Sequence, residues 1–315
     1  MIPLQIPTAY LEGYGALKKQ VSGLPWPRRP RFIFTSNSYN SDDVFKAWAA
    51  EKVETGAPFI IGQHGGGFGV TLLGLTEDHQ LAISDAWLSW GWEDGGNNKI
   101  KPVGNLKMIG QRLGWDPDGC ALMVETTIPR YSYHMFSAPV ASQWLDYFND
   151  QCHFVDALPG KICRCLLIRL DRHDWGWNQA ARWHERFPDL RLNDATNAIE
   201  PLVRKSRLHI STYNGTTFLE SLAMNIPTII FWNPKYWELR PGARQYFDRL
   251  KEVGIFHETP QSAAAKVAEV WDDVPGWWYQ PTIQEARRFF CDRFSRMPEN
   301  QLRVLKDVLT NVKSV

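Results

Sequence analysis

Short apolar runs alternate with longer segments of helical character along this chain, and this alternation restricts the fold more than any other feature of the sequence. Arg31–Ser36 and Pro58–Gly62 read as buried strands, and Asp42–Val53 between them reads as a helix with Ser41 as its N-cap. A strand, a helix and a strand in this order form a unit with parallel strands and a right-handed crossover.

Segments of the same two kinds continue towards the C-terminus. Further apolar runs lie at Leu81–Ser84, Trp87–Trp90, Lys101–Gly104, Ala121–Glu125, Cys163–Leu170, Leu208–Thr212 and Pro227–Phe231, with helical patterns near Ala141–Cys152, Gln179–Phe187 and Thr217–Met224 and beyond Ser262. This order predicts α/β layers around parallel sheets. A chain of 315 residues, 44% of them hydrophobic, suits two such domains. We predict two Rossmann-like parallel-sheet domains, residues 1–110 and 111–315.

Charge and cysteine usage exclude several classes of protein. The net charge of +1 gives no overall field that attracts nucleic acid, and no apolar stretch is long enough to span a bilayer. We expect Cys163 and Cys165 to share one face of a strand as reduced thiols, with a metal pair as the alternative. Asp116–Gly119 (DPDG) reads as a turn at the domain boundary, although its acidic residues resemble a metal-binding triplet. We therefore expect a cytoplasmic protein without a metal or other cofactor.

The segment Gln63–Gly69 (QHGGGFG) follows a predicted strand directly and is the first candidate for a site. Gly65, Gly66 and Gly67 allow close approach of the backbone, whose amides can bind a phosphate or a sugar group. His64 is a candidate acid, base or hydrogen-bond donor. The alternative is a tight turn beside a structural histidine.

The segment Ser211–Glu220 (STYNGTTFLE) joins a predicted strand to a predicted helix and is the second candidate. Ligands of open parallel sheets bind beyond the carboxyl ends of the strands, and the amides that begin a helix favour anions. Glu220 lies three residues after Thr217, which is the spacing of a capping box, so it either caps the helix or binds ribose hydroxyls. The candidate residues of this loop are Ser211, Thr212, Asn214, Gly215, Thr216, Thr217 and Glu220.

A third group of polar residues follows the strand that ends at Phe231. Asn233, Glu238 and Arg240 are candidates for contacts to a phosphate or a sugar, and Arg240 brings a positive charge. The alternative for Glu238 and Arg240 is a surface ion pair of little energetic consequence.

Two carboxylates are candidates for catalysis, because glycosyl transfer needs a base or a carboxylate nucleophile near the anomeric carbon. Glu125 ends the run ALMVE, and Asp85 follows the run LAIS. A polar cluster at 171–174 (DRHD) suggests a metal site or, alternatively, a solvated loop.

Long stretches of this sequence resemble a known family. They are SNSYNSDDVFKAWAAEKV, IGQHGGGFG, SDAWLSWGW, KPVGNLKM, STYNGTTFLESLAMNIPTIIFWNP, WELR and GIFHETP. They are similar to a family of transferases of bacterial O-antigen and surface-carbohydrate biosynthesis. The family is distantly similar to GT-B glycosyltransferases, including those that transfer Kdo or sialic acid from a CMP donor.

The resemblance implies roles for individual residues. Ser211, Thr216, Thr217 and Glu220 would bind the donor nucleotide, and His64 would lie near the transferred sugar or the acceptor. Family members carry a longer region before the strand that begins here at Arg31, so we expect the N-terminal domain to be truncated.

The function expected from the sequence is transfer of a sugar from a nucleotide-activated donor, with CMP among the candidate nucleotides, to a bacterial surface glycan such as O-antigen. The expected partners are the nucleotide sugar and a glycan or lipid-linked glycan acceptor, with the protein in the cytoplasm or at the inner face of the membrane. Two alternatives remain. One is a sugar-nucleotide epimerase, and the other is a shortened, non-catalytic subunit that pairs with another transferase.

Overall fold

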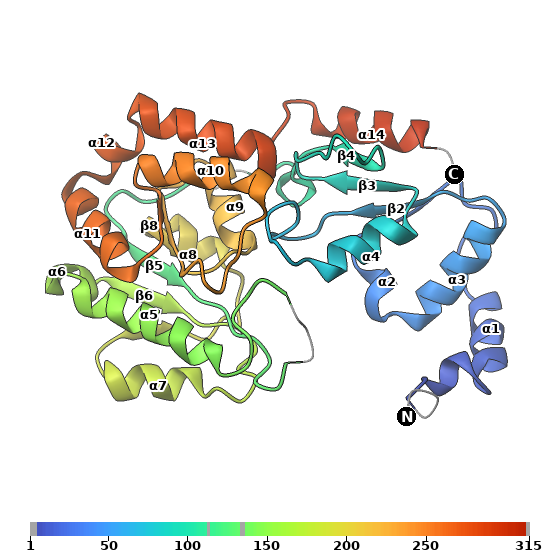
Figure 1. Ribbon diagram of the computed structural model, residues 1–315, viewed down its shortest axis with the longest axis horizontal. Coiled ribbons are helices and arrows are strands. Elements are labelled where there is room, and N and C mark those ends of the chain that lie inside the picture. The colour runs from blue at the N-terminus through green and yellow to red at the C-terminus, as the bar shows by residue number, and fades with distance from the viewer. Residues whose placement is uncertain (1–4, 112–113, 133–135, 313–315) are drawn as a thin grey trace. The chain divides into compact units, whose positions relative to one another are not determined.

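The computed structural model describes residues 5–111, 114–132 and 136–312, which fold into two compact units (Figure 1). The first unit comprises the described residues of 1–64, 76–107 and 298–315, and the second comprises those of 65–75 and 108–297. The predicted ranges, 1–110 and 111–315, differ from these units by three residues at the boundary (108–110) and at two longer segments. Residues 65–75 pack with the second unit and the C-terminal helix packs with the first, because tertiary contacts and not chain order decide where a segment belongs.

The first unit is built on a four-stranded parallel sheet in the order β1-β2-β3-β4. Its strands are β1 (Ile33–Thr35), β2 (Phe59–Gly62), β3 (Ala86–Ser89) and β4 (Ile100–Pro102), and its helices are α1 (Tyr14–Ser22), α2 (Ser38–Ser41), α3 (Asp43–Glu54), α4 (Leu75–Ile83) and α14 (Gln301–Asn311), with short 3-10 turns at Thr8–Tyr10 and Leu106–Met108. Ile60 and Leu88 are fully buried in the core of this sheet. Val304, Leu305, Val308 and Leu309 of α14 pack against that core, so the end of the chain completes the first unit.

Two local predictions for the first unit are wrong. The N-cap of α3 is Asp42, whose side chain accepts a hydrogen bond from the amide of Phe45 over 2.9 Å, whereas Ser41 ends α2. Leu81–Ser84 is not a separate strand, because its first residues form the last turn of α4. A short apolar run fits a helix turn as well as a strand, and periodicity over so few residues does not separate the two.

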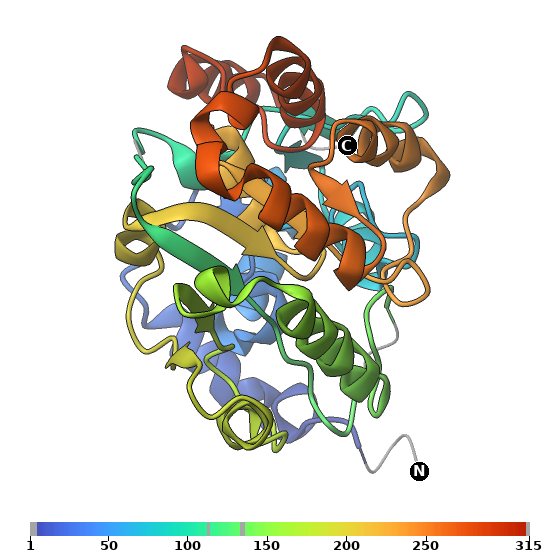
Figure 2. The same ribbon diagram turned by 90° about the vertical axis from the view of Figure 1, so that its left-hand side faces the viewer.

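The second unit contains a six-stranded parallel sheet in the order β10-β9-β8-β5-β6-β7. The strands are β5 (Cys120–Val124), β6 (Leu166–Arg169), β7 (Arg191–Asn193), β8 (Ser206–Ser211), β9 (Thr228–Phe231) and β10 (Phe256–His257), and the helices are α5 (Gln143–Ala157), α6 (Gly160–Cys163), α7 (Gln179–Arg186), α8 (Glu200–Arg204), α9 (Thr216–Ala223), α10 (Pro241–Glu252), α11 (Pro260–Val270), α12 (Val274–Trp278) and α13 (Pro281–Phe294), with a 3-10 turn at Trp271–Asp273. Figure 2 shows β5 and β8 side by side in the middle of this sheet. The prediction of two parallel-sheet α/β domains is confirmed.

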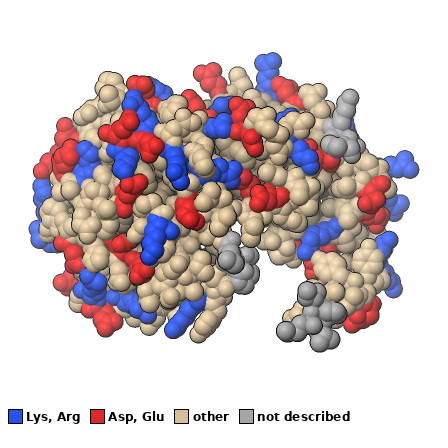
Figure 3. Space-filling view, viewed as in Figure 1, with Lys and Arg blue, Asp and Glu red and all other residues tan. Residues whose placement is uncertain are grey.

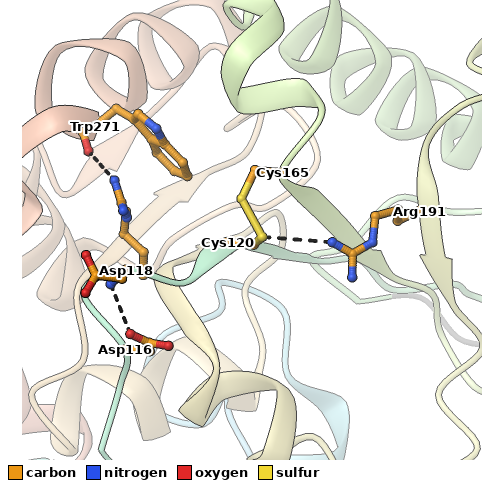
Figure 4. The surroundings of a disulfide bond; sticks show 7 residues. Asp116, Asp118, Cys120, Cys165, Arg191 and Trp271 are labelled. Carbon is orange, nitrogen blue, oxygen red and sulfur yellow. Dashed lines mark hydrogen bonds between the residues drawn. A yellow bond between two sulfur atoms is a disulfide. The ribbon is translucent and has the colours of Figure 1, made fainter.

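The cysteines differ from the prediction. Cys120 and Cys165 form a disulfide with their Cα atoms 5.0 Å apart (Figure 4), while Cys163 lies in α6 and not on a strand. β5 and β6 are neighbours in the sheet, so the residue that begins β5 lies beside the one that precedes β6. The expectation of reduced thiols therefore holds only for Cys152, Cys163 and Cys291. Pairing across 45 residues is a property of the sheet order, which spacing along the chain does not reveal.

Two features concern the charge and the hydropathy of the chain. Figure 3 shows Lys and Arg side chains interspersed with Asp and Glu over the face that it draws, as the net charge of +1 leads one to expect. Within the described parts of the chain, no helix combines the length and the apolar character needed to cross a membrane.

Candidate functional site

The loop between β8 and α9 lies at the carboxyl edge of the sheet of the second unit. β8 ends at Ser211 and α9 begins at Thr216, with Gly215 as its N-cap. Glycine has no side chain that can cap the first-turn amides, so these amides favour an anion. The capping-box interpretation of Glu220 is wrong, because Thr217 lies inside the helix and its hydroxyl donates to the hydroxyl of Tyr213 over 3.4 Å. Glu220 therefore remains a candidate for ligand binding.

The glycine segment lies directly against the start of α9, and both belong to the second unit. The amide of Gly66 donates to the hydroxyl of Thr216 over 3.0 Å, and a Cβ added at Gly66 would lie 2.2 Å from the carbonyl oxygen of Gly215. Gly67 has a φ of +85°, which favours glycine. The Gly65–Gly67 segment and the start of α9, which were predicted as separate sites, are therefore in contact through their backbones and form one backbone surface.

Residues 70–72, which follow the glycine segment, form hydrogen bonds with Glu238 and Arg240. The amide of Arg240 donates to the carbonyl of Val70 over 2.9 Å, and the amide of Leu72 donates to the carbonyl of Glu238 over 3.0 Å. The Arg240 Nε also donates to the carbonyl of Thr71 over 3.2 Å, and Ser137 donates to the Glu238 carboxylate over 3.2 Å. Glu238 and Arg240 therefore fix the position of the glycine segment.

The other polar residues of the β8–α9 loop divide into two kinds. The Thr212 hydroxyl donates to the carbonyl of Val124 over 2.9 Å and shares a hydrogen bond of 2.6 Å with the Tyr147 hydroxyl, and the Ser211 hydroxyl donates to the carbonyl of Tyr213 over 3.4 Å. Ser211 and Thr212 thus have structural partners. Asn214 is only 7% exposed, and neither atom of its amide has a partner among the residues that the structure describes. A buried amide without a hydrogen bond lowers stability by about 1–3 kcal/mol. A ligand that forms hydrogen bonds with Asn214 would remove this cost.

Asn233 serves a turn after β9. Its side-chain oxygen accepts a hydrogen bond from the amide of Lys235 over 3.0 Å. Its side chain also forms a hydrogen bond with Asp150, which opposes the rise of the Asp150 pKa that burial causes. These contacts give Asn233 a structural role, and a contact to a phosphate or a sugar stays a prediction.

Glu125 directly follows β5 and is 2% exposed. Its Oε2 accepts a hydrogen bond from the Trp183 indole over 2.9 Å, and its Oε1 has no partner among the described residues. Burial raises the pKa of Glu125 to about 8; the Trp183 hydrogen bond opposes this rise, and Asp171 and Asp174 add to it. At pH 7 the carboxyl group is mostly protonated, so it suits hydrogen-bond donation or acid chemistry and not the predicted role of a base.

Glu125 lines a cavity of about 390 Å³ within the second unit. The other lining residues are Val124, Arg169, Leu170, Asp171, Arg172, Ala195, Thr196, Asn197, Ala198, Ile199, Tyr213 and Thr217. Thr217 belongs to the first turn of α9, so the cavity adjoins the anion-binding end of that helix. The sequence pattern missed Arg169, Asn197 and Tyr213, because each is an ordinary residue on a strand or loop until the fold brings it to this cavity. It missed Trp183 for the same reason, since only the fold brings this indole to Glu125.

The cluster at 171–174 forms a loop and not a metal site. Asp171 accepts hydrogen bonds from the Thr126 hydroxyl and the Thr127 amide, both over 3.1 Å. Asp174 accepts from the amides of Asn178 and Gln179, both over 2.8 Å, at the start of α7. Across the described residues, no three His, Cys, Asp or Glu side chains are arranged to hold a metal ion.

The first unit contains the two remaining candidates, His64 and Asp85. Asp85 precedes β3 and so lies at the amino edge of the sheet, where its carboxylate accepts a hydrogen bond from the Phe59 amide over 2.7 Å. The predicted catalytic role of Asp85 does not fit this position, because ligands bind at the opposite edge. His64 follows β2 at the carboxyl edge. Desolvation, and then the charge of Lys107, lower the pKa of His64, so its ring is neutral at pH 7.

Gln63, which the sequence did not single out, orients the chain before His64. Its side-chain oxygen accepts from the Trp90 amide over 2.9 Å and from the Trp92 indole over 3.2 Å. Its carbonyl accepts from the Trp90 indole over 2.9 Å. The three bonds tie the end of β2 to the segment after β3 within the first unit.

Comparisons with known proteins give one family and several distant structures. The model described as LIC12162 family transferase matches residues 1–309, and no curated protein matches the sequence. The wall teichoic acid polymerase TagF is 12% identical, with 81% of this chain and 66% of TagF covered and a TM-score of 0.41. The C-terminal CMP-Kdo binding domain of WaaA from Acinetobacter baumannii is 11% identical, with 57% and 93% covered and a TM-score of 0.32. WaaG, a glycosyltransferase involved in lipopolysaccharide biosynthesis, is 8% identical, with 96% and 82% covered and a TM-score of 0.42.

Proposed function

Because the chain belongs to the LIC12162 family of transferases, we propose that it transfers a sugar from a nucleotide-activated donor to a bacterial surface glycan such as O-antigen. The family confirms the expectation of a transferase. The identities of the donor and the acceptor are proposals. One observation supports a binding site for the donor. The amide end of α9, capped by a glycine and covered by the Gly65–Gly67 segment, adjoins a polar cavity in the same unit.

The donor phosphate binds at the backbone surface that Gly65–Gly67 and the first turn of α9 form. Backbone amides and a helix N-terminus stabilise the charge that develops on a leaving phosphate. Asn214 and Glu220 supply polar side chains next to these amides, and Glu220 accepts hydrogen bonds from ribose hydroxyls. In this proposal the donor needs no further cofactor, and His64 exchanges a proton with the acceptor in its neutral form.

The acceptor is a glycan or a lipid-linked glycan, and the protein works in the cytoplasm or at the inner face of the membrane. A partner subunit remains part of this proposal. The support for the acceptor class is the resemblance of the long sequence motifs to the surface-carbohydrate transferases.

Calorimetric titration with CMP-, UDP- and GDP-linked sugars tests the donor site. We expect one nucleotide class to bind, and Glu220→Ala to weaken its binding about tenfold, which is the effect of one hydrogen bond. Glu185→Gln, on an exposed part of α7, is the control and leaves binding unchanged. Absence of binding by all three classes contradicts the proposal. Conversion of the donor sugar without an acceptor supports an epimerase instead.

A further inference from the structure

Hydrogen bonds within the protein hold part of the wall of the cavity beside Glu125. The Arg169 guanidinium donates to the side-chain oxygen of Asn193 over 2.8 Å and to the carbonyl of Asn197 over 2.6 Å. The loop that carries Asn197 contains Ala195, whose φ of +58° is unusual for a residue other than glycine. At about 390 Å³ the cavity lies near the lower end of the range for small-molecule sites, which is about 300–1,000 Å³.

The hydrogen bond from Trp183 decides which oxygen of Glu125 carries the proton. Oε2 accepts from the indole N–H over 2.9 Å, which suits a carbonyl oxygen. In the neutral carboxyl group the proton then lies on Oε1, which is the oxygen without a partner in the described parts of the chain. Glu125 is thus a buried hydrogen-bond donor without an acceptor among the residues that the structure describes.

Burial keeps the Glu125 carboxyl group neutral, and neighbouring acidic residues add a smaller effect. Asp171 and Asp174, in the loop after β6, add to the effect of burial on its pKa. Tyr147 and Cys152 of α5 also have raised pKa values, so they carry no charge at pH 7. Arg169 and Arg172 line the cavity and are the cations that face it, while Tyr213, on its other side, has a pKa raised to about 12 by burial.

We propose that this cavity binds the nucleobase of the donor, and that Glu125 Oε1 donates a hydrogen bond to a carbonyl oxygen or ring nitrogen of the base. This inference rests on the proposed function, because it takes the donor phosphate to lie at α9. Thr217 links that helix to the cavity, so the group attached to the phosphate on the nucleoside side enters it. Val124, Leu170 and Ile199 supply apolar contacts that suit the faces of a flat ring.

Binding of CMP, UMP, AMP and GMP, measured by calorimetry between about pH 7 and pH 9, tests this assignment. We expect wild-type affinity for at least one of them to fall about tenfold over this range, because ionised Glu125 no longer donates a hydrogen bond. Glu125→Gln keeps a donor in the same place, so its affinity stays within about threefold of the wild type and does not vary with pH. Glu125→Ala loses about tenfold at pH 7, and Glu185→Gln behaves as the wild type.

Ribose 5-phosphate serves as a probe without a base. We expect Glu125→Ala to leave its affinity within about twofold of the wild type, because Glu125 contacts the base and not the ribose phosphate. Equal losses for the nucleotide that binds and for ribose 5-phosphate overturn the assignment and leave the donor site intact. Nucleotide affinity that is the same in all variants and at all pH values has the same consequence. Failure of every nucleotide to bind wild-type protein overturns the donor site as well. A thermal melt of each variant confirms that it is folded.

Discussion

The amide nitrogen of Gly66 donates a hydrogen bond over 3.0 Å to the hydroxyl of Thr216, a residue 150 positions further along the chain. This bond joins the glycine segment to the start of α9 and makes one backbone surface from the two loops. A Cβ at position 66 would lie 2.2 Å from the carbonyl oxygen of Gly215, so only glycine permits this approach. The pairing of these two residues is the basis of the proposed donor site.

Gly66→Ala tests this close approach. We expect the free energy of unfolding to fall by about 1–3 kcal/mol, as for other steric overlaps in packed regions, and nucleotide binding to weaken with it. Gly95→Ala is a matched control, because an added Cβ there meets nothing within 4 Å. Urea unfolding and calorimetric titration of both variants give the measurement. Equal stability and equal nucleotide affinity in the two variants contradict the contact.

His209 of β8 makes the second unit sensitive to acid. It is 1% exposed, and neither ring nitrogen has a partner among the described residues. Burial lowers the pKa of His209 to about 4. The unfolded chain binds a proton near pH 6.5 and the folded chain does not. The free energy of unfolding therefore falls from about pH 6.5 towards pH 4, by at most ~1.4 kcal/mol per pH unit.

Replacement of His209 by Leu removes this acid sensitivity, because the titrating group is gone and no polar atom replaces it. Urea unfolding of wild type and variant at about pH 7 and pH 5 measures the effect, with the larger difference expected at the lower pH. The same decline towards acid in both proteins shows that another group is responsible.

The disulfide between Cys120 and Cys165 closes a loop of 45 residues and ties the beginnings of β5 and β6 together. We expect reduction by dithiothreitol to lower the free energy of unfolding by about 2–4 kcal/mol. Cys165→Ser has this lower stability from the start and does not respond to the reductant. Alkylation followed by mass spectrometry counts the free thiols, and modification of all five cysteines in native, unreduced protein contradicts the bond.

Much of the fold follows from local pattern. The runs near Pro58–Gly62, Ala121–Glu125 and Pro227–Phe231 are β-strands in the structure, because strands buried on both faces of a parallel sheet are almost continuously apolar. β7 (Arg191–Asn193) escaped prediction, since three residues with an arginine and an asparagine carry no such signal. The sequence also did not show that α14 packs against the first unit, because Ile60 and Leu88 in the core that it contacts are more than 200 positions before it.

The candidate site was predicted unevenly for the same reason. The β8–α9 loop follows a strand and begins a helix, so its position at the sheet edge was visible in the sequence. The end of β3 at which Asp85 lies was not visible in the sequence, because an apolar run beside a carboxylate does not show which end of a strand the carboxylate occupies. The neutral state of Glu125 depends on burial and on Trp183, 58 residues away, and no local pattern records it.

Amide hydrogen exchange with and without nucleotide is the most direct test of the donor site at the glycine segment and α9. CMP, UDP and GDP are added in turn, and exchange is followed by mass spectrometry of peptides that cover Gly65–Gly67 and Thr216–Ala223. For one of the nucleotides we expect slower exchange at both segments together, because their amides form one surface that binds the phosphate. Unchanged exchange at both segments with every nucleotide, or protection confined to other parts of the chain, contradicts the donor site.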